Sequence, residues 1–164
     1  MLDTLTKKMI GYYRGDPKRI QHFIKVHSFA ALIGRREGLE EKELFTLESA
    51  ALVHDIGIKQ AERLYGECGG KLQEKLGPPA AREMLTELGF ESSVIDRVCY
   101  MVSRHHTYTD IDGKDMQILI EADFLVNLYE DAVAPEGVMS AYRNIFRTES
   151  GKQICREMFG IDLK

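Results

Sequence analysis

Helix start and stop signals recur along the whole chain, and no segment makes a convincing strand. Asp16 followed by Pro17 is typical of a helix start, and Gly38 is typical of a helix end, so we predict a helix over about 17–37. Similar start and stop signals predict further helices over about 41–56, 78–89, 91–104, 114–131, 135–147 and 149–159. The sequence therefore predicts an all-α globular helix cluster with one long irregular stretch, over about 59–76.

Size and composition place the chain among single-domain globular proteins. Its 164 residues are enough for one core, and 44% hydrophobic with 29% charged residues is an ordinary globular balance. No apolar run reaches the ~20 residues that a membrane span needs, and the first ten residues lack the apolar stretch of about 7–15 residues found in secretory signals. We expect one domain over 1–164, no membrane partner and a cytoplasmic location.

Charge and cysteine content exclude two further classes of protein. The net charge is −4 and the basic residues are scattered, which argues against a dedicated partner of nucleic-acid polymers. Three cysteines without a C-x-x-C spacing argue against both a disulfide framework and a thiolate zinc site. Near the C-terminus, four large apolar residues fit either helical core or the contact of a homodimer: Met139, Phe146, Met158 and Phe159.

Three polar residues stand where helical spacing calls for apolar ones. His27 shares a stripe with Ile20, Phe23, Ile24 and Ala31, and His54 shares one with Leu47, Ala50, Ala51 and Ile58. Asp123 lies among Met116, Leu119, Ile120 and Val126. Each histidine alone fits a hydrogen-bonded core residue as well as a ligand, and the dipeptide His54–Asp55 alone is a weak signal.

The carboxylate of Asp123 is the hardest of these groups to explain without a ligand. A carboxylate removed from water needs a partner, and no Lys or Arg occurs between Lys114 and Arg143. Asn127, four residues on, is placed to hydrogen-bond and orient this carboxylate. Two imidazoles and two carboxylates on three helices suit one divalent ion, so the pattern indicates a buried metal site.

The same residues carry a resemblance to a known family. His27, then AALVHDIG at 50–57, then EADFLVN at 121–127 resembles the HD-domain metal-dependent phosphohydrolases, over about residues 20–130. The resemblance implies an all-helical fold in which His27, His54, Asp55 and Asp123 ligate one divalent ion, of Mn, Fe, Co, Ni, Zn or Mg. It also implies hydrolysis of a phosphate ester or anhydride of a small molecule, with nucleotides among the possible substrates. On this view the helices over about 135–159 follow the HD core.

Roles for further residues follow from the implied chemistry. Asp55 is assigned to orient the attacking water, with His106 as a second catalytic residue. Lys59, Arg104 and His105 are candidates for binding the phosphate of the substrate. The alternatives are a solvated surface charge for Lys59 and, for Arg104, a cation complementing the end of a helix.

The resemblance also bears on the number of metal ions. In the group similar to bacterial diadenosine-tetraphosphate hydrolases, one added histidine precedes Gly-Pro and another precedes Thr, whereas this chain has Leu76 before Gly77–Pro78 and His106 before Thr107. We therefore predict one tightly bound metal, with His106, and as the second choice His105, contacting phosphate or helping a weak second ion. His22 lies about 140° around the helix from His27 and is left out of the site.

Two other functions remain open at this stage. One is a catalytically silent HD fold that binds a nucleotide as a sensor, which the leucine at position 76 makes reasonable. The other is an iron-dependent oxygenase of the HD type, which generally uses more histidine ligands than this motif provides.

Overall fold

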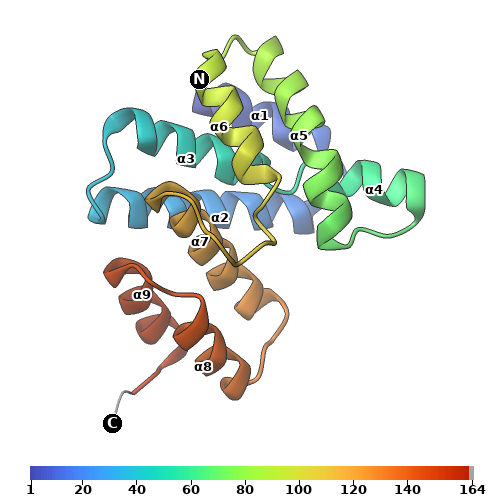
Figure 1. The fold of residues 1–164 in the computed structure, drawn as a ribbon. Coiled ribbons are helices and arrows are strands. Elements are labelled where there is room, and N and C mark those ends of the chain that lie inside the picture. Colours follow the sequence, from blue (N-terminus) through green and yellow to red (C-terminus); the bar gives the residue numbers. More distant parts are fainter. Residues whose placement is uncertain (163–164) are drawn as a thin grey trace.

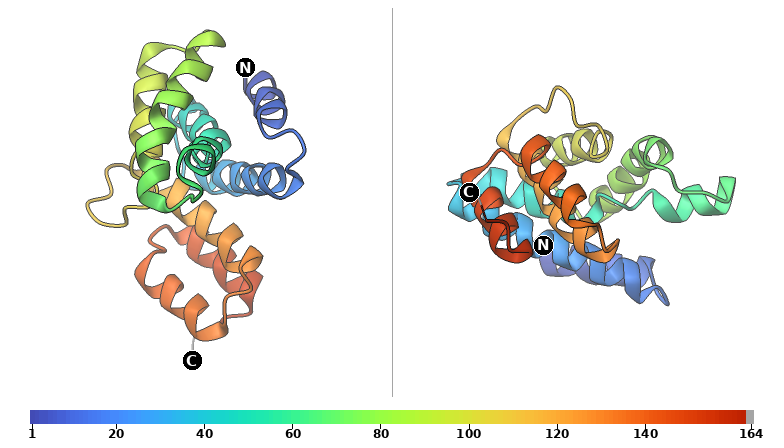
Figure 2. Two further views of the ribbon diagram at one scale, coloured as in Figure 1. Left: turned by 90° about the vertical axis from the view of Figure 1, so that its right-hand side faces the viewer. Right: turned by 90° about the horizontal axis from the view of Figure 1, so that it is seen from below.

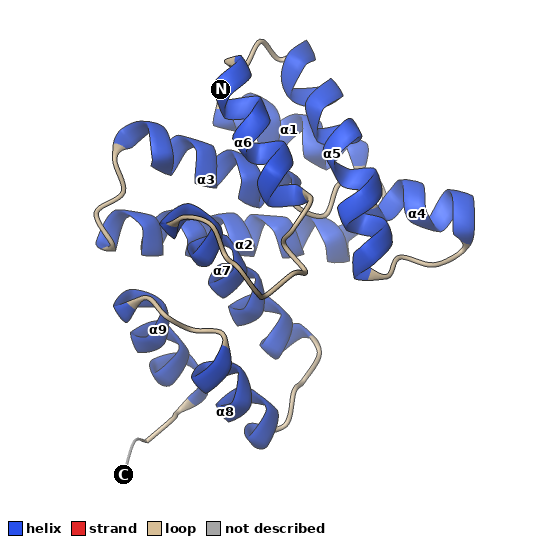
Figure 3. Ribbon diagram, viewed as in Figure 1, coloured by secondary structure: helices blue, strands red, loops and turns tan. Residues whose placement is uncertain are grey.

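Helices make up all the regular structure of the chain between residues 1 and 162, the part that the computed structural model describes (Figures 1 and 3). They are α1 (Leu2–Tyr12), α2 (Pro17–Arg36), α3 (Glu41–Val53), α4 (Ile58–Tyr65), α5 (Gly70–Glu87), α6 (Ser92–Val102), α7 (Lys114–Glu130), α8 (Pro135–Asn144) and α9 (Glu149–Phe159). The predicted all-α fold is confirmed. None of these helices combines the length and the apolar character that crossing a membrane would require.

The middle of the chain differs from the prediction. The stretch 59–76, predicted to be irregular, contains α4 and the first part of α5, and Pro78 and Pro79 lie inside α5 instead of starting it. A proline lacks the N–H of the helical hydrogen bond, which is why the pair resembles a helix start. Because α5 packs along α6 and against α4, tertiary contacts hold the helix continuous across both prolines.

The helices form a core around α2, α3 and α7. Helix α2 packs between α3 and α7, while α3 also contacts α1 and α6, and α5 packs against α6. Helices α8 and α9 lie at the opposite end of the molecule from α5 and α6, where α9 contacts α7 and α2 (Figures 1 and 2). The C-terminal helices therefore support the outer side of α7.

A close backbone contact fixes the turn that follows α3. A methyl group added at Gly57 would lie 2.8 Å from the backbone nitrogen of Gly77 and 2.9 Å from the carbonyl oxygen of Gln73. A methyl group added at Gly77 would lie 2.6 Å from Cγ1 of Val102, on the neighbouring helix α6. Glycine is thus required at both positions for the His54–Asp55 turn to lie against α5.

A buried carboxylate ties α9 to α7. Glu121 is fully buried and accepts hydrogen bonds from the backbone N–H groups of Arg147 (2.6 Å) and Thr148 (2.9 Å). It also accepts from the side chains of Gln117 and Thr148. Because a negative charge at the N-terminal end of a helix is favourable, Glu121 anchors the start of α9. Glu121 lies on α7, the helix that also carries Asp123.

Candidate metal centre

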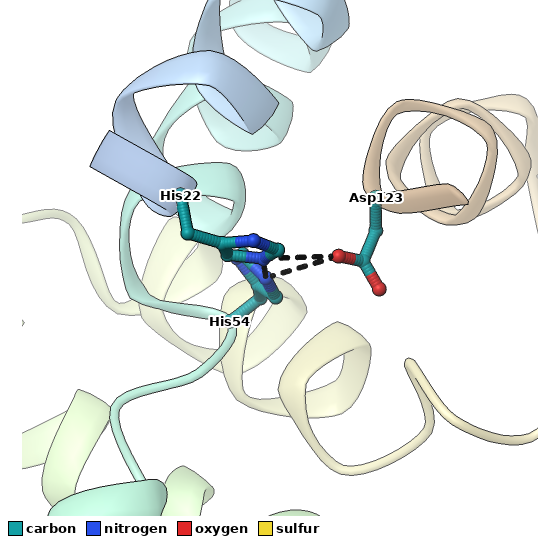
Figure 4. A group of neighbouring side chains, drawn as sticks. All are labelled: His22, His54 and Asp123. Carbon is teal, nitrogen blue, oxygen red and sulfur yellow. Dashed lines mark hydrogen bonds and ion pairs between the residues drawn. The ribbon is translucent and has the colours of Figure 1, made fainter. Parts of the chain in front are cut away.

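Three buried side chains from three helices meet in the centre of the molecule: His22 from α2, His54 from the end of α3 and Asp123 from α7 (Figure 4). The Nε2 atom of His22 lies 3.2 Å from Nε2 of His54 and 3.2 Å from Oδ1 of Asp123. The Nε2 atom of His54 lies 3.5 Å from the same Asp123 oxygen. These atoms point at one another from separate elements, as ligands of a shared ion do.

Asp55 adds a fourth donor atom to this group. Its Oδ2 atom lies 3.4 Å from Nε2 of His22 and 3.4 Å from Nε2 of His54. Ligands about 2.1 Å from an ion are separated by about 3.0 Å in an octahedral arrangement and about 3.4 Å in a tetrahedral one. The five separations given above, from 3.2 to 3.5 Å, are close to these values, so the two imidazole nitrogens suit an ion shared with the carboxylates of Asp123 and Asp55. We call these four residues the metal group.

Hydrogen bonds set the orientation of the two imidazole rings. The Nδ1 atom of His54 donates to the carbonyl oxygen of Ala51 at 2.8 Å, and Nδ1 of His22 donates to Oε2 of Glu130 at 2.8 Å. Both rings therefore direct Nε2 inward while Nδ1 is held from outside, which is the arrangement found when histidine binds a metal. Glu130 is in turn held by Lys25, whose Nζ lies 2.6 Å from its other oxygen.

The carboxylate of Asp123 is oriented by its own helix. Asn127 Nδ2 donates to Asp123 Oδ1 at 2.9 Å, one helical turn further on. No Lys or Arg of α7 neutralises this carboxylate, because Lys114 is the helix's sole residue of either type. The groups that can balance the charge of Asp123 therefore lie on other helices: the imidazoles of His22 and His54, or an ion bound with them.

The electrostatics of the metal group favour a positive charge at its centre. Burial alone would lower the pKa of His54, but the neighbouring carboxylates of Asp55 and Asp123 outweigh burial and raise this pKa well above its ordinary value. Burial alone would raise the pKa of Asp123, but hydrogen bonds from His22 and His54 lower it well below its ordinary value. The positive charge can be supplied by protons or by a divalent cation, so the two compete for this group.

A second group of donors shares Asp55. The Nε2 atom of His105 lies 3.4 Å from Oδ1 of Asp55 and has no hydrogen-bond partner, although His105 is only 1% exposed. His106 joins the same group, and its Nε2 is hydrogen-bonded to Oε1 of Gln73 at 3.0 Å. Burial and the charge of His105 lower the pKa of His106 to about 4. Asp55 thus directs one oxygen to the metal group and the other to His105.

The structure does not bring His27, a predicted ligand, together with the metal group. His27 lies beside Glu48, with 3.1 Å between Nε2 and Oε1, and burial lowers its pKa. The buried face of α2 is made by His22, Phe23, Val26, Ala30, Ala31, Ile33 and Gly34, whereas Ile20 and Ile24 are only partly buried. The signal that finds His22 is its spacing of four and eight residues from Val26 and Ala30.

Two of the predicted phosphate-binding residues lie elsewhere. A cavity of about 420 Å³ opens onto the metal group, and neither Lys59 nor Arg104 lines it. Lys59 donates to the carbonyl oxygen of Tyr12 at 2.6 Å, and Arg104 donates to that of Thr109 at 3.4 Å. His105 is too buried to contact a substrate directly, whereas His106 does line the cavity. The cations that line it are Lys18 and Arg19, which the sequence patterns did not single out.

Comparison with known proteins identifies the family. A family model described as the HD domain matches residues 19–138. The chain belongs to the HD-domain family. The family predicted from the sequence is thereby confirmed, and the matched range contains both groups of donors.

A solved structure has the same fold as this HD-domain protein. It is the crystal structure of a predicted HD superfamily hydrolase from an uncultured Thermotogales bacterium, with a TM-score of 0.69 and 24% sequence identity. The match covers 96% of this chain and 84% of that chain. A search of curated proteins finds no match. HD domains bind divalent metals, and the histidine and aspartate groups described above can hold one.

Proposed function

We propose that this HD-domain protein is a metal-dependent phosphohydrolase that cleaves a phosphate ester or anhydride of a small molecule, with nucleotides among the candidates. The observation that carries the proposal is that carboxylate oxygens of Asp55 and Asp123 lie 3.2–3.5 Å from the Nε2 atoms of His22 and His54, which themselves lie 3.2 Å apart. The adjoining cavity gives a small molecule access to this group.

The proposed metal ligands are His22, His54, Asp55 and Asp123. When bound, a divalent ion supplies water that is activated near neutral pH and draws charge from the phosphoryl oxygens. Asp55 accepts a hydrogen bond from the attacking water and orients it, because its two oxygens face both donor groups. His106 lines the cavity, and Gln73 fixes its ring, so we assign His106 to contact the phosphoryl group.

We propose one tightly bound ion. The metal group has four donor residues, whereas the second group has two histidines and shares Asp55. Leu76 stands where the related dinuclear enzymes have a histidine. A second ion beside His105 and His106 would therefore be held more weakly.

An HD-type iron oxygenase is the second candidate function. The structure favours it in one respect, because His105 and His106 raise to four the number of imidazoles beside Asp55 and Asp123. An oxygenase would purify with bound iron and show iron absorbance, and it would consume oxygen when given substrate. A phosphohydrolase releases inorganic phosphate without consuming oxygen.

Two histidines on α2 provide a matched test of the metal group. We expect His22→Ala to lose bound metal and hydrolysis, because it removes one of four ligands, while His27→Ala keeps both. Metal content is measured by elemental analysis, and hydrolysis with Mn²⁺, Co²⁺, Mg²⁺ or Ni²⁺ against a panel of phosphate esters. Asp55→Ala is expected to abolish hydrolysis. Undiminished activity in Asp55→Ala, or equal losses in the two histidine variants, would contradict the proposal.

A further inference from the structure

The cavity beside the metal group is small and its walls differ in charge. Its volume of about 420 Å³ lies toward the lower end of the range for ligand pockets, about 300–1,000 Å³. The first turn of α2 forms one wall, and the last turn of α7 forms another. A substrate whose phosphoryl group reaches the metal group must also fit between these walls.

Lys18 is the available cation on the α2 wall. The guanidinium of Arg19 is occupied by Asp16 at 2.7 Å and by Glu62 at 2.5 Å. Lys18 is exposed, and it forms no ion pair or side-chain hydrogen bond with any residue from 1 to 162. Since Lys18 precedes His22 by four residues, the two lie on the same face of α2, about 6 Å apart along the helix axis.

Carboxylates dominate the α7 wall. Glu130 lines the cavity while its oxygens are held by His22 and Lys25. Asp131 follows at the end of the helix, exposed and without an ion pair in the part of the chain that the structure describes. The C-terminal end of a helix carries partial negative charge, which adds to these carboxylates. This wall repels a second phosphate and accepts hydrogen bonds from hydroxyl groups.

The inner end of the cavity is formed by the metal group. His22, Asp55 and Asp123 line the cavity, together with His106. Behind Asp55, the buried Nε2 atom of His105 lies 3.4 Å from Oδ1 and has no hydrogen-bond partner in the part of the chain that the structure describes. A phosphoryl group that enters the cavity therefore reaches the carboxylates and imidazoles of the metal group.

We propose, on the basis of the function proposed above, that Lys18 anchors the phosphoryl group of a phosphomonoester and that the α7 wall selects a hydroxyl-bearing remainder without further phosphates. A nucleoside or sugar monophosphate satisfies these conditions. The extra phosphates of a triphosphate would face the unpaired carboxylate of Asp131 and the C-terminal end of α7, where Lys25 is already paired with Glu130. The pocket thus discriminates by charge as well as by size.

The substrate class is tested with one nucleoside in two phosphorylated forms. We expect kcat/KM for the 5′-monophosphate to exceed that for the 5′-triphosphate by about 10-fold or more, since repulsion at the wall opposes the longer chain. Asp131→Asn should lower this ratio, because it removes the negative charge of the Asp131 carboxylate from the α7 wall. A preference for the triphosphate, or a ratio that Asp131→Asn leaves unchanged, overturns the selection by the α7 wall.

The anchor is tested with Lys18→Ala, with Lys18→Arg as rescue and Lys42→Ala as the surface control. Lys42 is exposed and paired with Glu91, away from the cavity. Loss of a charged hydrogen bond predicts a KM for the monophosphate about 10- to 100-fold higher in Lys18→Ala, with a smaller change in kcat and unchanged metal content. The Arg variant should restore most of this loss. A KM shift no larger than that of Lys42→Ala overturns the anchor.

Binding of inorganic phosphate separates this inference from the proposed function. Calorimetry on the metal-loaded protein should show phosphate binding that Lys18→Ala weakens by a similar factor. Lys18-dependent phosphate binding without hydrolysis of any ester would support the anchor and contradict the phosphohydrolase. Hydrolysis with the same KM in Lys18→Ala as in the wild type would support the phosphohydrolase and overturn the anchor.

Discussion

Replacing Gly57 by alanine tests how the turn that carries His54 and Asp55 is held in place. Gly57 has φ −71° and ψ −20°, a conformation that alanine adopts without strain. The added methyl group would nevertheless lie 2.8 and 2.9 Å from backbone atoms of Gly77 and Gln73. Backbone atoms cannot rotate away, so the turn and α5 must separate by about 0.7 Å to reach the ordinary contact distance of about 3.5 Å.

The expected cost follows from that displacement. Overpacking of this kind destabilises a protein by about 1–3 kcal/mol. For a chain of this size each kcal/mol lowers the melting temperature by about 2–4 °C, so Gly57→Ala should melt about 2–12 °C below the wild type. Hydrolysis should also fall, by up to about 100-fold, because α5 carries Gln73 and Gln73 positions His106.

Thermal unfolding in the presence of a chelator measures the stability change without a contribution from bound metal. Gly11→Ala is the control, since an added methyl group in α1 meets no atom within 4 Å. It should stabilise the protein by up to about 1 kcal/mol, because alanine favours helix over glycine. A Gly57→Ala protein as stable and as active as Gly11→Ala would refute the reasoning about the close backbone contact.

Three further predictions concern other parts of the molecule. Glu130→Ala should weaken metal binding by about 10- to 100-fold in calorimetry, because His22 loses the carboxylate that orients it, and unchanged affinity would contradict this role. Glu121→Ala should lower the free energy of unfolding in urea by about 2–5 kcal/mol, because two backbone N–H groups at the start of α9 lose their acceptor; a loss below about 0.5 kcal/mol would show that water replaces the carboxylate. Iodoacetamide at pH 8 should label Cys68 in the native protein and leave Cys99 and Cys155 unlabelled, as mass spectrometry would show, since burial raises the pKa of Cys99 and raises that of Cys155 to about 11.

Local patterns in the sequence were sufficient for the helical class and for part of the site. Asp16 does cap α2, with its side chain accepting a hydrogen bond from the backbone of Arg19. His54 and Asp123 interrupt apolar stripes, and both prove to be buried beside one another. Such signals can be read from the sequence because each depends on the period of a single helix.

The tertiary structure decided which face of α2 meets the core. Both His22 and His27 have apolar residues at helical spacing, so the period alone leaves two faces possible. Packing of α2 against α3 and α7 buries the face of His22 and leaves His27 beside Glu48. The rotation of a helix about its axis depends on its neighbours, which a local pattern does not contain.

Distance along the chain explains why the remaining site residues were missed. Lys18 and Glu130 lie far apart in the chain but both line the cavity, whereas Lys59 closely follows the His54–Asp55 turn and its side chain donates to the carbonyl oxygen of Tyr12. Helix α5 likewise continues through Pro78 and Pro79 because of its contacts with α6 and α4. The sequence by itself thus determined the helical class, the family and the inward position of His54 and Asp123. Which charges line the cavity beside the metal group was decided only by packing, because that depends on contacts between helices far apart in the chain.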